Sequence, residues 1–268
     1  MFDLKNKIII ITGAGGFLGK NFCKFLLLFK AQIVAIDNSQ KKLNYLKKII
    51  KELDIDKKKF YLIKCNIASE SEVKKTRNKI LKKFKKIDVL INNATFRPKN
   101  LKNYYKPFEN FNISDWKEVS SVDNEGTFLM IKHFCNIMKK RREGSIINIG
   151  SVYSQLAPNF EIYKDSFYKG VKMNSPAVYS VNKFGINGLT RYLASYLGKY
   201  KIRVNCISPG GIQNDHSKKF IKNYSSKVPL NRMGNINDLI GVIVLLSSNE
   251  SSFITGQNIL VDGGLSCW

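Results

Sequence analysis

The sequence has 268 residues, 44% of them hydrophobic, and carries 45 lysine and arginine residues against 20 aspartate and glutamate, for a formal net charge of +25. A chain of this size can bury one core. We expect neither a signal peptide nor a membrane span, because no apolar run approaches the length that a bilayer requires. The 5 cysteines are scattered and include no CxxC pair. They argue against a disulfide framework or a zinc site and indicate a cytoplasmic protein with reduced thiols.

The excess of lysine has two interpretations. Basic surface is typical of proteins that bind nucleic acid, and it also arises when lysine covers solvated helix faces. The basic clusters fall at expected helix ends and connections, and aromatic residues do not alternate with them as they do in single-strand binders. We favour the second interpretation and expect no nucleic-acid partner. A positive field would still help to attract an anionic small-molecule substrate.

The chain begins with a strand, a glycine-rich turn and a helix. Residues 7–11 form a continuous apolar run that is typical of a strand buried on both faces. A glycine-rich stretch follows at 12–19, then an apolar helix at 21–29 and a second strand at 32–36 that ends in Asp37. This order is typical of a dinucleotide site. The helix N-terminus binds pyrophosphate there, while the acidic residue binds the ribose hydroxyls and repels a 2′-phosphate.

Strands and helices continue to alternate to the end of the sequence. We expect helices at about 41–51, 70–84, 114–140, 177–200 and 237–247, and strands at 60–63, 88–91, 144–149, 202–207 and 258–261. This alternation predicts one α/β domain over residues 1–268, a Rossmann-like, doubly wound parallel sheet of about seven strands with helices on both faces. The candidate motifs all lie at the carboxyl ends of strands, where ligands bind in this class of fold.

A tyrosine and a lysine one helical turn apart mark the candidate catalytic centre. Tyr179 and Lys183 have this spacing near the start of a long helical pattern. Tyr168 and Lys172 share the spacing, but their segment contains a glycine and stops short of a proline. An ammonium group one turn away stabilises a phenolate, which suits a tyrosine that exchanges a proton at neutral pH. We therefore choose Tyr179 and Lys183.

These motifs resemble those of the classical short-chain dehydrogenase/reductase family, and the resemblance covers essentially the whole sequence. The matching segments are 12–19 for the cofactor loop, Asn92-Asn93-Ala94, Ser151, the Tyr179–Lys183 pair, Pro209-Gly210 and the closing stretch 261–264. The resemblance implies reversible hydride transfer between a nicotinamide and a carbonyl or secondary alcohol. It also implies that Tyr179 is the general acid or base, that Ser151 hydrogen-bonds the substrate oxygen, and that Lys183 assists Tyr179 and holds the ribose hydroxyls.

Carried over residue by residue, the resemblance assigns two groups of positions. The catalytic group is Ser151, Tyr179, Lys183 and Asp123, the last because it stands where the family has a proton-relay asparagine. The cofactor-binding group is Gly13, Gly15, Gly16, Phe17, Leu18, Gly19, Asp37, Asn66, Ile67, Asn93, Ala94, Tyr179, Lys183, Pro209, Gly210 and Ile212. Asp37 predicts NAD as the cofactor, while the two lysines that follow it at 41 and 42 leave NADP open. Neither histidine lies at ligand spacing from an acidic neighbour, so we predict no metal.

Four departures from the family pattern bear on function. Phe17 replaces a glycine of the classical loop, but the remaining glycines keep the spacing of the extended branch of the superfamily. Asn66 replaces an aspartate near the adenine. Asp123 replaces the relay asparagine, so the relay would run through its backbone carbonyl and a water molecule. The interval between the catalytic serine and tyrosine is long, and the extra segment at 153–175 would form a wall or lid over the site, beside a second substrate loop at about 212–230.

The long segment, together with the stretches at 108–111 and 208–212, is similar to a subgroup associated with bacterial surface and flagellar sugar biosynthesis, which implies a sugar or sugar-derived substrate. A 3-oxoacyl-(acyl carrier protein) reductase is the main alternative, because its acidic partner protein would suit a basic surface. A dinucleotide-binding regulator without turnover is an alternative of another class. The family resemblance also implies a homodimer or homotetramer formed through the helices at 114–140 and 176–200.

Overall fold

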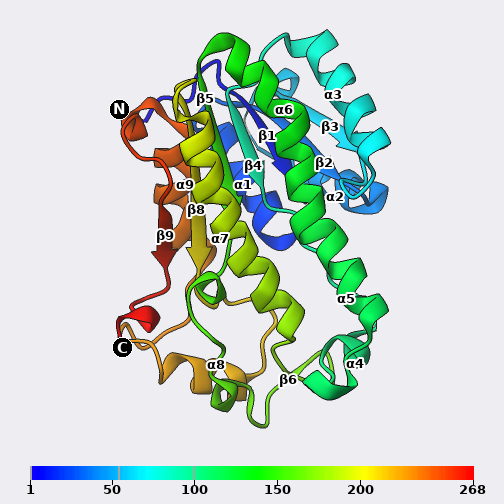
Figure 1. Cartoon of the computed structure of the whole chain (residues 1–268), viewed down its shortest axis with the longest axis vertical. Helices are drawn as coiled ribbons and strands as arrows, with labels where there is room; N and C mark the ends of the chain where they lie inside the picture. Colours follow the sequence, from blue (N-terminus) through cyan, green and yellow to red (C-terminus); the bar gives the residue numbers. More distant parts are fainter. Residues whose placement is uncertain (1, 54, 99) are drawn as a thin grey trace.

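A parallel sheet forms the centre of the molecule (Figure 1), and the computed structural model describes residues 2–53, 55–98 and 100–268. Within these residues seven strands follow the order β3-β2-β1-β4-β5-β8-β9, and each neighbouring pair is parallel. The strands are β1 (Ile8–Thr12), β2 (Gln32–Asp37), β3 (Phe60–Lys64), β4 (Val89–Asn92), β5 (Gly144–Ile149), β8 (Ile202–Pro209) and β9 (Asn258–Val261). Ile10 of β1 lies opposite Val34 of β2 and Leu90 of β4. The strand order reverses at β1, which places a ligand crevice at the carboxyl ends of β1 and β4.

Helices cover both faces of the sheet. They are α1 (Phe17–Leu28), α2 (Gln40–Lys51), α3 (Glu70–Phe84), α4 (Leu101–Tyr104), α5 (Ile113–Ser120), α6 (Thr127–Arg141), α7 (Ala177–Gly198), α8 (Lys218–Ser225) and α9 (Ile240–Ser247). Ile9 and Ile11 of β1 pack with residues of α1, α2 and α9, whereas Ile8 and Ile10 pack with residues of α3, α6 and α7. No helix in the described part of the chain is long and apolar enough to cross a membrane. The prediction of a doubly wound α/β fold is confirmed.

Two predicted helices differ from the observed ones. The first helix begins earlier than predicted, at Phe17, because the glycine turn ends in extended backbone at Gly16 and the helix starts directly after it. The helix predicted over 114–140 is interrupted between α5 and α6 by a π-helical turn at Ser121–Gly126. A single π-helical turn changes the hydrophobic periodicity too little to be predicted from the sequence. Such turns occur frequently at functional sites.

The segment at 153–175 covers the carboxyl edge of the sheet next to α8, at the bottom of Figure 1. It contains two 3₁₀ turns and a short antiparallel hairpin. The hairpin consists of β6 (Phe167–Tyr168) and β7 (Val171–Lys172). The buried apolar side chains of the 153–175 segment pack with those of α8 in one cluster. Tyr168 and Lys172 therefore lie on a hairpin, whereas Tyr179 and Lys183 lie on a helix.

Candidate active site

A cavity of about 530 Å³ opens along the carboxyl edge of the sheet. Its wall is formed by the glycine turn, the loops after β2, β4, β5 and β8, the start of α7, the 153–175 segment and α8. The cavity therefore lies where the strand order reverses, as expected for the ligand site of a doubly wound sheet. One end contains the glycine turn and Asp37, and the other end is enclosed by aromatic side chains.

The glycine turn is packed so closely that side chains do not fit at its key positions. Gly13 has a φ of +61°, and a Cβ there would lie 2.7 Å from the Cα of Ala94. A Cβ on Gly19 would collide with the Gly13 carbonyl oxygen. Gly16, the N-cap of α1, offers no side chain to the first N–H groups of the helix, and Gly16 and Phe17 both line the cavity. An uncapped N-terminus of this kind fits an anionic group such as a pyrophosphate.

Asp37, at the end of β2, is held in place by backbone donors. It is 5% exposed; its Oδ2 accepts from the Gly15 N–H at 2.9 Å and its Oδ1 accepts from the Ser39 N–H at 2.9 Å. A Cβ on Gly15 would lie 2.5 Å from the Cβ of Lys42, so a glycine is needed for this close approach. Each carboxylate oxygen retains a lone pair for a further donor, such as a ribose hydroxyl. Asp37 and Lys42 both line this end of the cavity.

Asn93, directly after β4, connects the glycine turn to the sheet. Its Nδ2 donates to the carbonyl oxygens of Thr12 and Gly13, at 2.9 and 3.2 Å. The Thr12 hydroxyl oxygen in turn accepts from the N–H groups of Asn93 and Ala94, at 3.0 and 3.1 Å. These bonds fix the backbone that a dinucleotide would contact.

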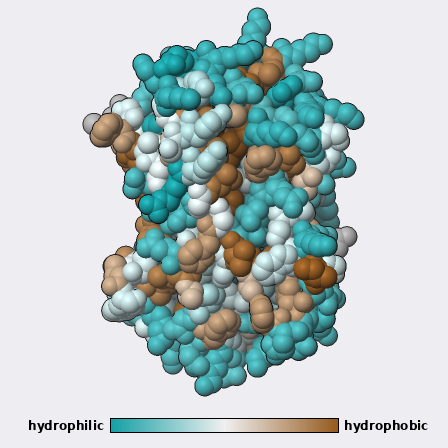
Figure 2. Space-filling view, viewed as in Figure 1, coloured by the Kyte–Doolittle hydropathy of each residue, from teal (hydrophilic) through white to brown (hydrophobic). Residues whose placement is uncertain are grey.

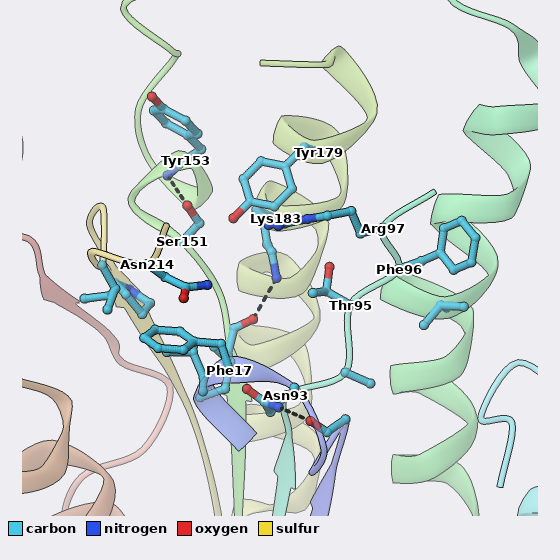
Figure 3. A pocket seen from close by; sticks show the side chains of 18 of the residues that line it. Phe17, Asn93, Thr95, Phe96, Arg97, Ser151, Tyr153, Tyr179, Lys183 and Asn214 are labelled. Atoms are coloured by element: carbon cyan, nitrogen blue, oxygen red, sulfur yellow. Dashed lines mark hydrogen bonds between the residues drawn. The ribbon is translucent and has the colours of Figure 1, made fainter. Parts of the chain in front are cut away.

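Tyr179, Lys183 and Ser151 come from two elements and meet in the middle of the cavity (Figure 3). The Lys183 Nζ lies 5.6 Å from the centre of the Tyr179 ring and donates to the Ile149 carbonyl oxygen at 3.0 Å. The Ser151 Oγ accepts from the Tyr153 N–H at 3.2 Å, so the hydroxyl hydrogen of the serine stays available. Figure 3 shows the Tyr179 and Ser151 hydroxyls directed into the same space.

Asp123 lies behind the cavity wall. It is 3% exposed; its Oδ1 accepts from the Phe96 N–H at 2.7 Å and its Oδ2 accepts from the Thr95 hydroxyl at 2.9 Å. Its backbone carbonyl accepts from the Thr127 hydroxyl at 2.7 Å. Burial raises the pKa of the Asp123 carboxyl, and the charge of Lys183 and the two hydrogen bonds only partly offset this effect. The carboxylate thus anchors the loop that follows β4.

Buried tyrosines form the other end of the cavity. The hydroxyls of Tyr153 and Tyr163 hydrogen-bond to each other at 2.8 Å, and the Tyr224 hydroxyl accepts from the Gly211 N–H. Burial raises the pKa of Tyr153 and of Tyr224 to about 12, and it also raises the pKa of Tyr163. These phenols stay protonated at neutral pH. They offer hydrogen bonds and flat apolar faces to a ligand.

Most of the predicted site residues line this cavity. They are Gly13, Gly16, Phe17, Leu18, Asp37, Asn66, Ile67, Asn93, Ala94, Ser151, Tyr179, Lys183, Pro209, Gly210 and Ile212. Gly15, Gly19 and Asp123 are not part of its described wall. Each of these three supports a wall residue from behind, because Gly15 holds Asp37, Gly19 packs on the glycine turn and Asp123 anchors the β4 loop.

Sequence reasoning missed wall residues that loops contribute. They are Thr95, Phe96, Arg97, Tyr104 and Tyr105 after β4, and Asn174, Asn214 and His216 toward the aromatic end. The 95–113 loop has no periodicity that would assign a role to any of its side chains. Its position was the available signal, because a loop that follows a strand beside the reversal point borders the crevice.

Comparisons with known proteins place the chain in a family. A family model described as enoyl-(acyl carrier protein) reductase matches residues 18–266. The sequence is 32% identical over 265 residues to post-translational flagellin modification protein A of Campylobacter coli, covering 97% of this chain and 98% of that protein. It is 32% identical over 275 residues to 2-dehydro-3-deoxy-D-gluconate 5-dehydrogenase of Formosa agariphila, covering 99% and 94%. It is 32% identical over 265 residues to a 3-oxoacyl-[acyl-carrier-protein] reductase of Buchnera aphidicola, covering 97% and 97%.

Solved structures of dehydrogenases share the fold of this chain. A short-chain dehydrogenase from Leptospira borgpetersenii with bound NAD+ has a TM-score of 0.84 and 35% identity, covering 98% of this chain and 94% of that one. A gluconate 5-dehydrogenase from Burkholderia cenocepacia in complex with NADP and tartrate has a TM-score of 0.85 and 25% identity, covering 100% and 98%. Fold and site together define a dehydrogenase of the doubly wound class. The chain belongs to the short-chain dehydrogenase/reductase family, whose members are oxidoreductases that act on CH–OH or C=O groups with NAD or NADP.

Proposed function

We propose that this protein transfers a hydride between NAD and a carbonyl or secondary alcohol of a sugar or sugar-derived substrate, as a cytoplasmic step in the synthesis of surface glycans. The observation that carries the proposal is the placement of Ser151, Tyr179 and Lys183 around one cavity whose far end is lined by the glycine turn. The same wall thus offers proton-transfer groups and a dinucleotide site.

The contacts of each side chain suit the role that we propose for it. The Tyr179 hydroxyl has no hydrogen-bond partner among the described residues, so it is free to exchange a proton with the substrate oxygen. Ser151 donates its hydroxyl hydrogen to the same oxygen. The buried Lys183 ammonium group lies beside the Tyr179 ring and has two N–H donors left for ribose hydroxyls. The nicotinamide supplies or takes the hydride when bound.

Asp37 favours NAD over NADP. Its carboxylate is fixed at the end of β2, where it can accept from ribose hydroxyls and repel a 2′-phosphate. The relative with bound NAD+ is 35% identical and the relative with bound NADP is 25% identical. Lys42 lies beside Asp37 and acts in the opposite sense, because an ammonium group attracts a phosphate.

The aromatic end of the cavity favours a sugar-derived substrate. Its tyrosines combine flat apolar faces with hydroxyl groups, which suits a ring or chain that carries several hydroxyls. A flagellin modification protein and a deoxygluconate dehydrogenase are among the relatives. The second candidate is reduction of a 3-oxoacyl group on acyl carrier protein, which the name of the Buchnera relative and the basic charge of this chain support.

A fluorescence titration with NADH and NADPH, followed by a turnover screen, tests these proposals. Tighter binding of NADH together with oxidation or reduction of sugar derivatives is the expected result. Turnover of 3-oxoacyl carrier-protein thioesters without turnover of sugars would establish the second candidate. Dinucleotide binding without turnover of either class would point to a non-catalytic regulator, and failure to bind either dinucleotide would refute the proposed function.

We also propose a homo-oligomer that forms through α5, α6 and α7. Figure 2 shows apolar residues along the middle of the face on which α6 and α7 lie. Ile113 of α5, Phe128 of α6, and Val181 and Phe184 of α7 are exposed apolar side chains. An apolar surface that continues across several helices is typical of a subunit interface. Light scattering of the purified protein should give a dimer or tetramer mass, and a monomer mass at micromolar concentration would contradict the proposal.

A further inference from the structure

At the aromatic end of the cavity, two side chains from separate segments lie next to the Tyr168 ring. The Arg97 guanidinium carbon lies 5.3 Å from the ring centre, and Nη1 donates to the Tyr168 hydroxyl at 3.3 Å. The imidazole of His216 lies next to the same ring, with ring centres 6.0 Å apart. All three side chains line the cavity. We call Arg97, Tyr168 and His216 the outer cluster.

The charge of Arg97 is not neutralised within the described part of the chain. No described carboxylate lies within 4.0 Å of its guanidinium, whereas Arg141 and Arg232 each pair with an aspartate. The described wall of the cavity contains one acidic residue, Asp37, and it lies at the opposite end beside the glycine turn. The Nζ of Lys169 adds positive charge 5.5 Å from the Tyr168 ring. Asp215 lies outside the described wall, and its charge acts on His216. The wall at the outer end of the cavity therefore carries the positive charge of Arg97, whose guanidinium has donors to spare.

His216 complements Arg97 as a neutral donor. Its Nδ1 accepts from the Asn214 N–H at 3.1 Å, which leaves the ring hydrogen of the neutral imidazole on Nε2. Burial and the nearby charge of Arg97 lower the pKa of His216, so the ring is uncharged at pH 7. Stacking on Phe220, with ring centres 4.9 Å apart and planes 20° apart, fixes the ring orientation.

The backbone next to Arg97 is fixed as well. The two preceding residues both donate to the buried Asp123 carboxylate, Thr95 through its hydroxyl and Phe96 through its N–H. Figure 3 shows Arg97 extending from this loop toward the side of the cavity on which Tyr179 lies. A guanidinium on an anchored loop loses less conformational freedom when it binds a ligand.

We propose that the outer cluster binds an anionic group of the substrate, a carboxylate or a phosphate, so that the substrate class of this enzyme is an acidic or phosphorylated sugar derivative. The guanidinium of Arg97 supplies the charge and a bidentate donor geometry, and His216 and Tyr168 supply further donors. The distance from Tyr179 to this end of the cavity then selects which hydroxyl of the substrate reaches the catalytic centre. This inference rests on the proposed dehydrogenase activity of the same cavity.

The test compares matched substrates that differ at one terminal group, which is a neutral hydroxymethyl, a carboxylate or a phosphate ester. Oxidation with NAD is measured for sorbitol, gluconate and sorbitol 6-phosphate, and for the corresponding neutral, carboxylate and phosphate members of the mannitol and xylitol series. Charge-assisted hydrogen bonds predict that kcat/KM of the favoured anionic member exceeds that of its neutral partner by about 10- to 100-fold. Preference for the carboxylate or for the phosphate identifies which anion the site binds.

Variants of Arg97 assign the effect to the cluster. Arg97→Gln should remove the anion preference by raising KM for the anionic member about 10- to 100-fold, and Arg97→Lys should keep part of the preference. Arg77→Gln is the matched control, because Arg77 lies on α3 outside the cavity wall and donates to its neighbour Asn78. The control should retain the full preference.

Three results would overturn the inference. They are equal kcat/KM for neutral and anionic members in the unmodified protein, an anion preference that survives in Arg97→Gln, and no turnover of any member by protein that binds NADH. The last result would leave dinucleotide binding intact and refute the proposal that the substrate is an acidic or phosphorylated sugar derivative. Failure to bind NADH would instead refute the proposed function itself, so the two failures are distinguishable.

Discussion

Replacing Asp37 by asparagine should shift the cofactor preference toward NADPH. Two like charges about 4 Å apart repel by about 4 kcal/mol at an effective dielectric constant of about 20, which corresponds to about 1000-fold in affinity. Salt screening and the neighbouring Lys42 reduce this effect, so we expect the ratio of the NADPH and NADH dissociation constants to fall by about 10- to 1000-fold. Asparagine keeps one acceptor atom but loses the other for the N–H groups of Gly15 and Ser39 and for the ribose hydroxyls, so NADH binding should weaken as well.

The assay is a fluorescence titration with each dinucleotide at two salt concentrations. The preference of the unmodified protein for NADH should decrease as salt rises, because the repulsion is electrostatic. Asp56→Asn is the control, since Asp56 caps the turn before β3, at the edge of the sheet opposite the site. An unchanged ratio in Asp37→Asn, or an equal change in the control, would refute the assignment of cofactor preference to Asp37.

Two further predictions concern the catalytic and structural roles of single groups. Tyr179→Phe should lower kcat by about 100- to 10,000-fold while the NADH dissociation constant stays within about twofold. Tyr61 lies outside the cavity wall, so the control Tyr61→Phe should change neither quantity. Full activity in Tyr179→Phe would show that another group transfers the proton. Burial raises the pKa of the Asp123 carboxyl above 3.8, so the folded state favours its neutral form and loses stability as the pH rises through the raised value. The Tm difference between Asp123→Asn and the unmodified protein should therefore favour the variant more at pH 7 than at pH 4, by about 2–4 °C for each kcal/mol, and a Tm difference independent of pH would contradict this account.

The parts of the site that could be predicted from sequence are those whose chemistry is local. The glycine turn, Asp37 and the Tyr179–Lys183 pair each depend on neighbours within a few residues or on the spacing of one helix turn. The strands could also be predicted, because a run such as residues 8–11 is apolar on both faces, and the structure buries both faces of β1. Local rules and the tertiary fold agree at these positions.

The aromatic end of the cavity could not be predicted in the same way. Arg97 and His216 lie on segments without regular periodicity, and they approach each other because the β4 loop, the 153–175 segment and α8 pack together. The π-helical turn at Ser121–Gly126 is a similar case, because its effect is to present one carboxylate to a loop that is distant in sequence. Such pairings depend on tertiary contacts, which hydrophobic periodicity does not encode.

Asp123 stands where the family resemblance expects an asparagine, and its contacts give a physical reason for the difference. The loop after β4 directs two donors at this residue, and a carboxylate accepts both at once, while an amide has one acceptor. Burying a carboxylate is unfavourable by itself, and these two hydrogen bonds offset part of that cost, so we infer that Asp123 acts as a positioning residue for Arg97. Asp123→Ala should then raise KM for an anionic substrate several-fold and leave both kcat and the KM of the neutral analogue nearly unchanged. A role in proton transfer would lower kcat for both substrates, and that outcome would refute the positioning role.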